Sequence, residues 1–297
     1  MSSKQRYFVY GIVIIAMMIW GMTFIWYKQV YVEIRPVSLV FLRLLIASPV
    51  LLIVSALGRK LQRIRRHDLP FFLALAFFEP FLYFMGESFG MQRVSPTLGS
   101  VIVATIPLFT PLAASFFYHE RFTKINIAGI AISIGGVCMV MAGEMSFSGS
   151  TFHGVLLMFM AVFAAVGYSV MVIKLAGSYN SFSIVSWQNT IGLLYFLPLF
   201  VIFEWDHAGQ VRWTSSVIIP LLELALFGSA LAFVFFTYSI KRLGITRSTV
   251  FSNLIPVFTT LFSYYFLREE ITILKIAGIA VVIGGLLLTQ LEKRQVR

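Results

Sequence analysis

Residues 101–137, VIVATIPLFTPLAASFFYHERFTKINIAGIAISIGGV, recur later in the same 297-residue chain. The second copy spans residues 250–286 and reads VFSNLIPVFTTLFSYYFLREEITILKIAGIAVVIGGL. At a constant offset of 149 residues, 17 of the 37 aligned positions are identical without any gap. We interpret so dense a match as an internal duplication, which predicts that the chain consists of two related halves.

The two copies share an Ile-Pro pair, a glutamate and an apolar run that contains glycine. These are Ile106-Pro107 with Ile255-Pro256, Glu120 with Glu269, and residues 127–131 with residues 276–280. Agreement outside the copies is weaker, although Lys28 aligns with Lys174 at an offset of 146 residues. The duplication therefore extends toward the start of each half.

The composition is typical of a membrane protein. Apolar residues make up 59% of the chain, charged residues only 12%, and the mean hydropathy is +0.90. A soluble domain carries about 25% charged residues. The net charge of +11 does not indicate nucleic-acid binding, because the basic residues lie in short loops between apolar segments. The single cysteine, Cys138, lies in an apolar run, and we predict that it is buried.

Apolar segments divide the chain into ten predicted spans, since a hydrocarbon core about 30 Å thick needs about 20 apolar residues per helix. They are residues 7–29, 36–57, 70–92, 95–118, 123–142, 152–175, 183–204, 215–241, 245–267 and 272–291. We therefore predict an all-α membrane protein with ten transmembrane helices. One five-helix repeat is expected in residues 1–147 and the other in residues 148–297.

The distribution of Lys and Arg predicts the orientation. With the N-terminus inside, the inner segments hold 16 of the 23 Lys and Arg residues and the outer segments hold six. Positive charge gathers on the cytoplasmic side, so we predict a multi-pass protein of the inner or plasma membrane with both termini in the cytoplasm. Five spans separate the two copies, and five is odd, so the copies run in opposite directions. Such inverted repeats are typical of secondary transporters that work by alternating access.

The order of these motifs resembles the EamA-type transporters of the drug/metabolite transporter superfamily over nearly the whole chain. The motifs are Trp20-Gly21, Arg43 in Phe41-Leu42-Arg43, the two Ile-Pro pairs, the two glutamates, and the Gly-Gly pairs that end at Gly136 and Gly285. The resemblance implies ten helices around a central cavity, and export of an amino acid or another small metabolite. Glu79 departs from the pattern, because the second half has Gly228 at that position. This departure keeps organic cations or polar lipid-linked molecules open as substrates.

Glu79 is the candidate for the central functional group, since an ionisable side chain inside the membrane costs about 2.5–3.5 kcal/mol on insertion scales. It lies nine residues into the third predicted span, and Tyr83 and Glu87 follow at four-residue steps. On a regular helix these side chains share one face. We predict that this face lines a cavity, that Glu79 binds substrate or exchanges a proton, and that Tyr83 bonds to Glu79 or stacks on substrate. The alternative is a protonated carboxyl that only joins neighbouring helices.

Arg43 and Glu87 lie at matching depths in the second and third predicted spans. A buried arginine and a buried glutamate avoid isolated charges when they pair. We predict a structural or gating ion pair, and direct contact of either residue with substrate is the alternative.

Two tryptophans and two prolines complete the candidate cavity. Trp20 and Trp187 are predicted to form cavity walls, with packing or interfacial anchoring as the alternative. Pro107 and Pro256 lie mid-span and are predicted to kink their helices, which frees the backbone carbonyl four residues before each. Two interpretations of each kink are open: plain packing, or a part of the cavity wall. In the second case polar residues beside Pro256 contact the substrate. These are Ser252 and Asn253.

Two further patterns favour structural roles. Glu120 and Glu269 each precede a threonine by three residues, and we expect a carboxylate-fixed turn followed by a hydroxyl cap on the next helix. Glycines at equivalent positions of the two copies predict close helix contacts, with packing within each half as the simpler case and a dimer face as the alternative. These are Gly129, Gly135, Gly136, Gly278, Gly284 and Gly285.

No catalytic or metal-binding pattern emerges. The four histidines are widely separated, and no Gly-rich phosphate loop with its lysine is present. We therefore expect no enzymatic activity and no cofactor, with transport driven by a proton gradient or by exchange. The expected partners are a small-molecule substrate and membrane lipids, without nucleic acid, and the chain is expected to be a monomer or homodimer. A membrane enzyme or receptor is the competing class, and it would need clustered catalytic groups or a sizeable outer domain.

Overall fold

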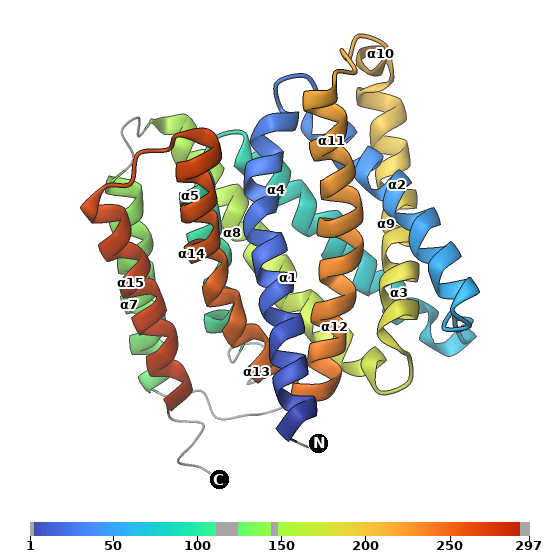
Figure 1. The fold of residues 1–297 in the computed structure, drawn as a ribbon, viewed down its shortest axis with the longest axis horizontal. Helices are drawn as coiled ribbons and strands as arrows, with labels where there is room; N and C mark the ends of the chain where they lie inside the picture. The colour runs from blue at the N-terminus through green and yellow to red at the C-terminus, as the bar shows by residue number, and fades with distance from the viewer. Residues whose placement is uncertain (1–2, 111–123, 144–147, 292–297) are drawn as a thin grey trace.

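The structure, a computed structural model, describes residues 3–110, 124–143 and 148–291. Every regular element in these ranges is helical (Figure 1). Seven helical segments there are long and apolar enough to cross a membrane, and three shorter apolar helices accompany them. The start of α1 and the end of α15 lie at the same end of the molecule (Figure 1).

Short connections join the helices in chain order. Before residue 148 the elements are α1 (Ser3–Val30), α2 (Pro36–Leu57), η1 (Arg66–Asp68), α3 (Leu69–Ala76), η2 (Phe77–Leu82), α4 (Tyr83–Met91), α5 (Pro96–Val103) and α7 (Lys124–Ala142). After it they are α8 (Gly149–Ala176), α9 (Ser181–Phe203), α10 (Trp205–Ala208), α11 (Ser215–Glu223), η3 (Leu224–Leu231), α12 (Ala232–Leu243), α13 (Ile245–Val250), η4 (Phe251–Asn253), α14 (Leu254–Phe262), η5 (Ser263–Leu267) and α15 (Ile273–Leu291).

Local sequence signals set where several helices begin. Ser95, Ser148 and Asn180 precede α5, α8 and α9, and each side chain accepts a hydrogen bond from a backbone N–H of the first turn. Such caps satisfy donors that the helix itself cannot pair. The predicted second span, 36–57, has the same bounds as α2, and α7, α8, α9 and α15 begin and end within three residues of their predicted spans.

Two pairs of helices have matching lengths at the offsets found in the sequence. α1 and α8 each have 28 residues and start 146 residues apart, while α7 and α15 each have 19 residues and start 149 residues apart. The third long segment and its counterpart, residues 66–91 and 215–243, each contain a π-helical section, η2 and η3. The helix pattern therefore repeats along with the sequence pattern.

The equivalent helices α7 and α15 lie side by side (Figure 1) and run antiparallel. A methyl group added at Gly136 would lie 2.7 Å from the carbonyl oxygen of Gly278, and one at Gly285 would lie 2.7 Å from that of Gly129. The two contacts exchange equivalent residues, as a two-fold axis requires. The predicted close contact is found at Gly129, Gly136, Gly278 and Gly285, but it joins the two halves instead of lying within one half. Gly135 and Gly284 face open space, so the prediction is wrong for these two. Only glycine fits where the two backbones approach so closely.

The third segment departs from a regular helix at Glu79. Glu79 has extended backbone angles (φ −148°, ψ 118°) and is joined to Pro80 by a cis peptide bond. Proline lacks an N–H and disfavours a helical residue before it. The prediction that Glu79, Tyr83 and Glu87 share one face of a regular helix is therefore wrong, because the helix is interrupted at the first of the three.

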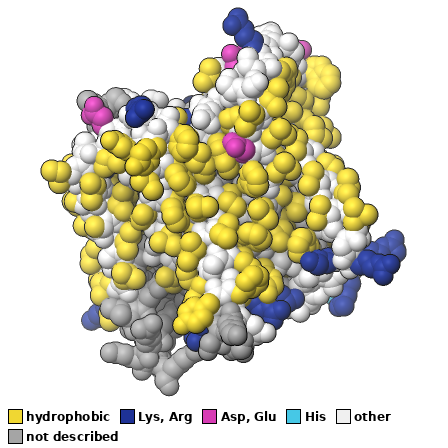
Figure 2. Space-filling model, viewed as in Figure 1, with side chains coloured by type: hydrophobic (Ala, Val, Ile, Leu, Met, Phe, Trp, Pro, Cys, Tyr) yellow, Lys and Arg dark blue, Asp and Glu magenta, His cyan; other side chains and the backbone are white. Residues whose placement is uncertain are grey.

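On the face seen in Figure 2, the surface between the two ends is largely apolar, and basic side chains gather near the ends. Cys138 is exposed on α7, so the prediction of a buried thiol is wrong. Glu120 lies outside the described residues. Its counterpart Glu269 bonds to Ser263 and pairs with Lys275 Nζ at 2.9 Å, and Thr272 Oγ1 accepts the Lys275 N–H as the predicted cap.

Candidate functional site

A cavity with about 70 Å³ of space for water-sized molecules lies among the helices. This volume is smaller than the roughly 300–1,000 Å³ of pockets that hold small molecules in other proteins. Its lining comes from α1, α2, the η2–α4 segment, α5 and its continuation, α8, α12, α13, η4 and α14. The lining residues are Trp20, Thr23, Phe24, Arg43, Glu79, Tyr83, Phe84, Glu87, Val103, Ile106, Ala165, Tyr168, Ser169, Phe233, Phe236, Thr249, Ser252 and Ile255.

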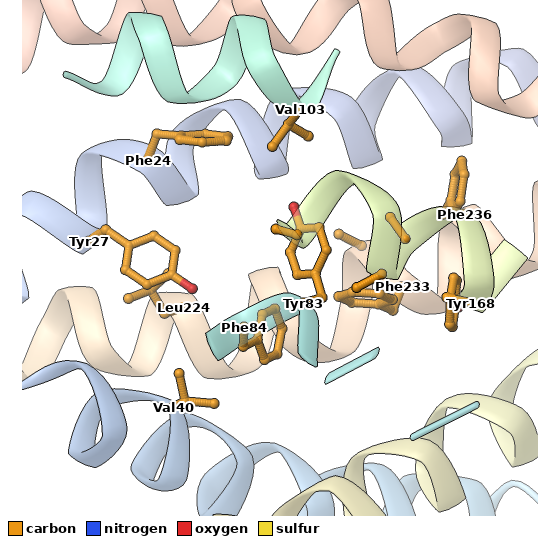
Figure 3. Packing of buried hydrophobic residues seen from close by; sticks show 14 of the residues in the cluster. Phe24, Tyr27, Val40, Tyr83, Phe84, Val103, Tyr168, Leu224, Phe233 and Phe236 are labelled. Atoms are coloured by element: carbon orange, nitrogen blue, oxygen red, sulfur yellow. The ribbon is translucent and has the colours of Figure 1, made fainter. Parts of the chain in front are cut away.

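Aromatic rings form much of the cavity wall (Figure 3). The Trp20 ring packs edge-on against Phe233 and Phe236, with ring centroids 5.1 and 5.0 Å apart. Tyr168 also packs edge-on against Phe233 at 6.4 Å. The Trp20 Nε1–H donates to the Gly228 carbonyl at 3.3 Å. The predicted place of Trp20 in the wall is therefore met, and its polar tip is used for packing between helices.

Arg43 and Glu87 are joined by a tyrosine from α1. Arg43 Nη1 donates to the Tyr27 hydroxyl at 2.6 Å, and that hydroxyl donates to Glu87 Oε2 at 2.7 Å. Arg43 Nε donates to Ser229 Oγ at 2.7 Å, and the guanidinium lies 4.1 Å from the Phe84 ring centroid. Arg43 is 2% exposed and Glu87 is 5% exposed, so both charges are withdrawn from solvent.

The geometry changes two predictions about this network. The described residues contain no direct ion pair between Arg43 and Glu87, and the contact runs through the Tyr27 hydroxyl instead. Tyr83 donates to Glu87 Oε1 at 3.0 Å rather than to Glu79. The interruption at Glu79 explains the second difference, because it turns the Glu79 side chain out of the helical register of Tyr83 and Glu87.

Glu79 borders the cavity, is 6% exposed, and makes no hydrogen bond or ion pair within the part of the chain that the structure describes. By contrast, Arg43, Glu87 and Tyr83 are bonded to one another or through Tyr27. Glu79 is thus the one carboxyl in the lining that the described residues leave open to a proton or a ligand. A buried carboxyl that is neither paired nor bonded is a candidate for function.

Both prolines follow a break in their helix. α5 ends at Val103, residues 104–105 form a turn, and residues 106–110 are helical again around Pro107. In the equivalent place, η4 (Phe251–Asn253) interrupts the helix ahead of Pro256. The predicted kinks are confirmed, and Val103 and Ser252 both border the cavity. Asn253 does not border it, although its side chain is 7% exposed and its Oδ1 has no partner among the described residues.

Trp187 lies away from the cavity, so its predicted place in the wall is wrong. Its Nε1–H donates to the Gln62 carbonyl at 2.8 Å, at the end of the molecule where α2 joins α3. Here residues 60–65 pack against residues 179–187, and we call this contact the clasp. Its other bonds include Gln62 N to Ser183 Oγ at 2.8 Å and Arg65 N to the Tyr179 hydroxyl at 3.1 Å. The Lys60 carbonyl accepts from Ser183 Oγ and Asn180 Nδ2 at 2.7 and 2.6 Å, and Gln62 Oε1 accepts from Asn180 N and Nδ2 at 2.7 and 2.9 Å.

Sequence reasoning missed Tyr27, Phe233 and Phe236. Tyr27 follows Trp20 and Thr23 at helical spacing, so the polar tips on one face of the first span were a usable signal. Phe233 and Phe236 carry no such signal, because the chain has 30 phenylalanines, many of them within predicted spans. Their place in the wall depends on how the helices pack.

Comparison with known proteins agrees with this architecture. A transporter from Archaeoglobus fulgidus is 26% identical over 90% of this chain and 93% of its own length. A "probable amino-acid metabolite efflux pump" of Salmonella typhimurium is 26% identical over 96% of this chain and 94% of its own. A "probable terminal-alkyne amino-acid exporter" of Streptantibioticus cattleyicolor is 28% identical over 83% and 81%. One solved crystal structure superposes with a TM-score of 0.71 at 17% identity over 95% of this chain and 98% of that one, which shows a common fold.

The model of one family matches the chain twice. The EamA-like transporter family aligns with residues 8–142 and again with residues 152–291. Together the two matches cover nearly the whole sequence, including every element that borders the cavity. The chain is therefore a multi-pass membrane protein and belongs to the EamA-like transporter family.

Proposed function

We propose that this protein is a secondary transporter that exports a small metabolite, such as an amino acid, by alternating access. Ten spans form two inverted five-helix repeats, residues 1–147 and 148–297, in the inner or plasma membrane with both termini in the cytoplasm. The antiparallel packing of the equivalent helices α7 and α15 supports the inverted arrangement. The matching helix lengths in the two halves support it further.

The observation that carries the proposal is a central cavity with elements of both repeats in its wall and one unpaired carboxyl. The α1, α2, η2, α4 and α5 side of the wall comes from the first repeat, and the α8, α12 and α14 side from the second. Rocking of one repeat against the other would open such a cavity to each side in turn. The names of two relatives, an amino-acid exporter and an amino-acid efflux pump, support an amino acid as substrate.

Glu79 couples transport to protons in this proposal. The Arg43 charge is compensated by Glu87 through Tyr27, so Glu79 supplies the unbalanced charge of the cavity. The Glu79 carboxyl gives up its proton when substrate binds and regains a proton after the substrate is released. In this way the carboxyl exchanges a proton for a substrate molecule. The substrate and the proton then move in opposite directions, and a proton gradient directed into the cell drives export.

An organic cation is the second candidate substrate. Aromatic faces attract cations through the ring quadrupole, with energies of about 0.5–2 kcal/mol. Trp20, Tyr168 and Phe233 place such rings in the wall of the cavity that contains Glu79. An amino-acid substrate has a carboxylate that needs a basic partner in the cavity, whereas an organic cation does not. Arg43 already bonds to Tyr27 and Ser229 and lies against the Phe84 ring.

Counterflow into proteoliposomes tests both candidates. Vesicles with purified protein are loaded with unlabelled leucine, phenylalanine or ethidium, and entry of the same labelled compound is measured. Accumulation of leucine or phenylalanine supports an amino-acid exporter, and accumulation of ethidium alone supports an organic-cation carrier. No counterflow of any compound in a broad panel, with correctly folded protein, would contradict the transport proposal.

Glu79→Gln tests the coupling role, because glutamine keeps the shape of the side chain but cannot ionise. We expect normal expression and thermal stability, with uphill, pH-dependent transport largely lost. Wild-type pH dependence in Glu79→Gln vesicles would return Glu79 to a structural role.

A further inference from the structure

Three buried polar side chains, of which Tyr168 borders the cavity, lie close together but form no side-chain hydrogen bond of good geometry with any described residue. They are Tyr168 of α8, Gln188 of α9 and Thr237 of α12, which are 2%, 0% and 0% exposed. The Tyr168 hydroxyl faces the other two side chains. Nevertheless, neither hydroxyl and neither polar atom of the Gln188 amide forms a bond of acceptable geometry. We call these three residues the polar cluster.

The polar cluster has the composition of a water site. Buried polar groups in proteins are almost always bonded, either to protein or to ordered water. A buried water needs about two to four polar partners. The polar cluster offers two hydroxyls, an amide N–H₂ and an amide carbonyl, carried by three helices that pack on one another. Water can therefore satisfy atoms that the protein leaves unpaired.

The position of the polar cluster connects the cavity with the clasp. Tyr168 borders the cavity beside Phe233 (Figure 3). Thr237 lies one turn beyond Phe233 on α12, and Lys241, about 6 Å further along at 1.5 Å per residue, donates to the Tyr179 carbonyl in the clasp at 3.1 Å. Gln188 directly follows Trp187, which bonds to the Gln62 carbonyl there. The cluster thus extends from the cavity wall at Tyr168 to within about one helical turn of the clasp.

We propose that the polar cluster holds water and forms a proton path between Glu79 and the clasp end of the molecule. This inference rests on the proposed function, in which Glu79 exchanges a proton. A proton from the clasp end adds to water held by Gln188 and Thr237. The Tyr168 hydroxyl accepts a proton from that water and passes its own proton to the Glu79 carboxylate, directly or through cavity water. The water and the Tyr168 hydroxyl each gain one proton and lose one proton, so both are unchanged at the end. The Glu79 carboxylate gains one proton and becomes neutral.

The other ionisable groups around Glu79 do not lead toward the clasp. Arg43 of α2 and Tyr83 and Glu87 of α4 are held together in the network around Tyr27. Tyr195 of α9 donates to the Leu73 carbonyl. Tyr168 of α8 therefore gives Glu79 its connection to the clasp end among the described residues that pack around it.

The test compares two modes of transport in the same proteoliposomes. The first is accumulation of labelled leucine or ethidium driven by a pH gradient, which requires protons to reach Glu79. The second is counterflow of the same compound at equal pH, which requires substrate exchange without net proton movement. The variants are Tyr168→Phe, Gln188→Met and Thr237→Val, alone and combined. Thr260→Val is the matched control, since the Thr260 hydroxyl is also buried and unpartnered but lies on α14, away from the cavity lining.

We expect the double variant Gln188→Met with Thr237→Val to lose at least tenfold in gradient-driven accumulation while counterflow stays within twofold of wild type. Tyr168→Phe should lower gradient-driven accumulation, and because Tyr168 borders the cavity, no expectation is placed on its counterflow. Thr260→Val should change neither. If both modes are unchanged in the double variant, or if both fall in parallel, the proton path is wrong, and in the second case the cluster contacts substrate instead. Should the double variant fail to fold, the same split between the two modes is read from Thr237→Val and Gln188→Met alone. Absence of both modes in wild type would contradict the proposed function itself, which is a distinct outcome.

Discussion

Replacing Tyr27 by phenylalanine tests the charge network at the centre of the protein. The ring is fully buried and would stay in place, while the hydroxyl that bonds to Arg43 at 2.6 Å and to Glu87 at 2.7 Å would be lost. A hydrogen bond to a charged group contributes about 1.5–3 kcal/mol, so two of them contribute about 3–6 kcal/mol. Ser229 still accepts from Arg43 and Tyr83 still donates to Glu87. We therefore expect a loss of about 3 kcal/mol, at the lower end of that range.

Thermal unfolding of the purified protein, followed by tryptophan fluorescence, measures this loss. Each kcal/mol lowers Tm by about 2–4 °C in chains of comparable size, so the expected drop is about 6–12 °C. Tyr31→Phe is the matched control. This variant removes a partly buried hydroxyl, on the residue that follows α1, that bonds to neutral Ser88 atoms at 2.6 and 2.9 Å, and a loss of about 1 kcal/mol is expected. Equal drops in Tm for the two variants would refute the role of Tyr27 as a bridge between charges.

Three further predictions address other parts of the fold. Combining Arg43→Met with Glu87→Gln should restore part of the protein yield lost in the worse single variant, because no buried charge then lacks its partner; simply additive losses would show that the two residues are not coupled. Gly136→Ala should lower Tm, because its methyl group would meet the Gly278 backbone, whereas Gly135→Ala next to it faces open space and should not; similar Tm values for both would contradict the close contact of α7 with α15. Cysteines placed by Arg63→Cys and Gln210→Cys should react with impermeant reagents from opposite sides of the membrane, and labelling from the same side would refute the inverted repeats.

The helical framework could be predicted well because it depends on local and periodic information. The bilayer sets the length of each apolar segment, so composition alone locates α2 to the residue and α7 and α15 to within one residue. The bounds of these helices need no knowledge of how distant helices pack. The duplication marked the glycines, but the sequence favoured contacts within each half. The approach of Gly136 to Gly278 joins the two halves and is seen only in the structure.

The cavity was predicted less completely because its lining depends on side-chain directions. Glu79 was identified by its charge, yet the Pro80 that follows it was overlooked, and Pro80 is the local signal for the interruption that separates Glu79 from Tyr83 and Glu87. Matching depth placed Arg43 near Glu87 but could not reveal the tyrosine between them. The prediction for Trp187 was wrong because the sequence does not distinguish a tryptophan in a cavity wall from one whose indole N–H bonds to a loop carbonyl. The Trp187 indole N–H bonds to the Gln62 carbonyl.

The clasp bears on how tightly each side of the membrane would bind substrate. At the clasp end, several bonds join residues 60–65 to residues 179–187, whereas at the end where α9 leads into α10 the buried Ser38 hydroxyl donates to Glu204 at 3.2 Å. In a carrier with two conformers, the dissociation constant seen from one side equals the intrinsic value divided by the fraction of molecules open to that side. Each additional 1.4 kcal/mol of clasp stability lowers the open fraction about tenfold. The residues that tune apparent affinity then include Asn180 and Ser183, which do not border the cavity.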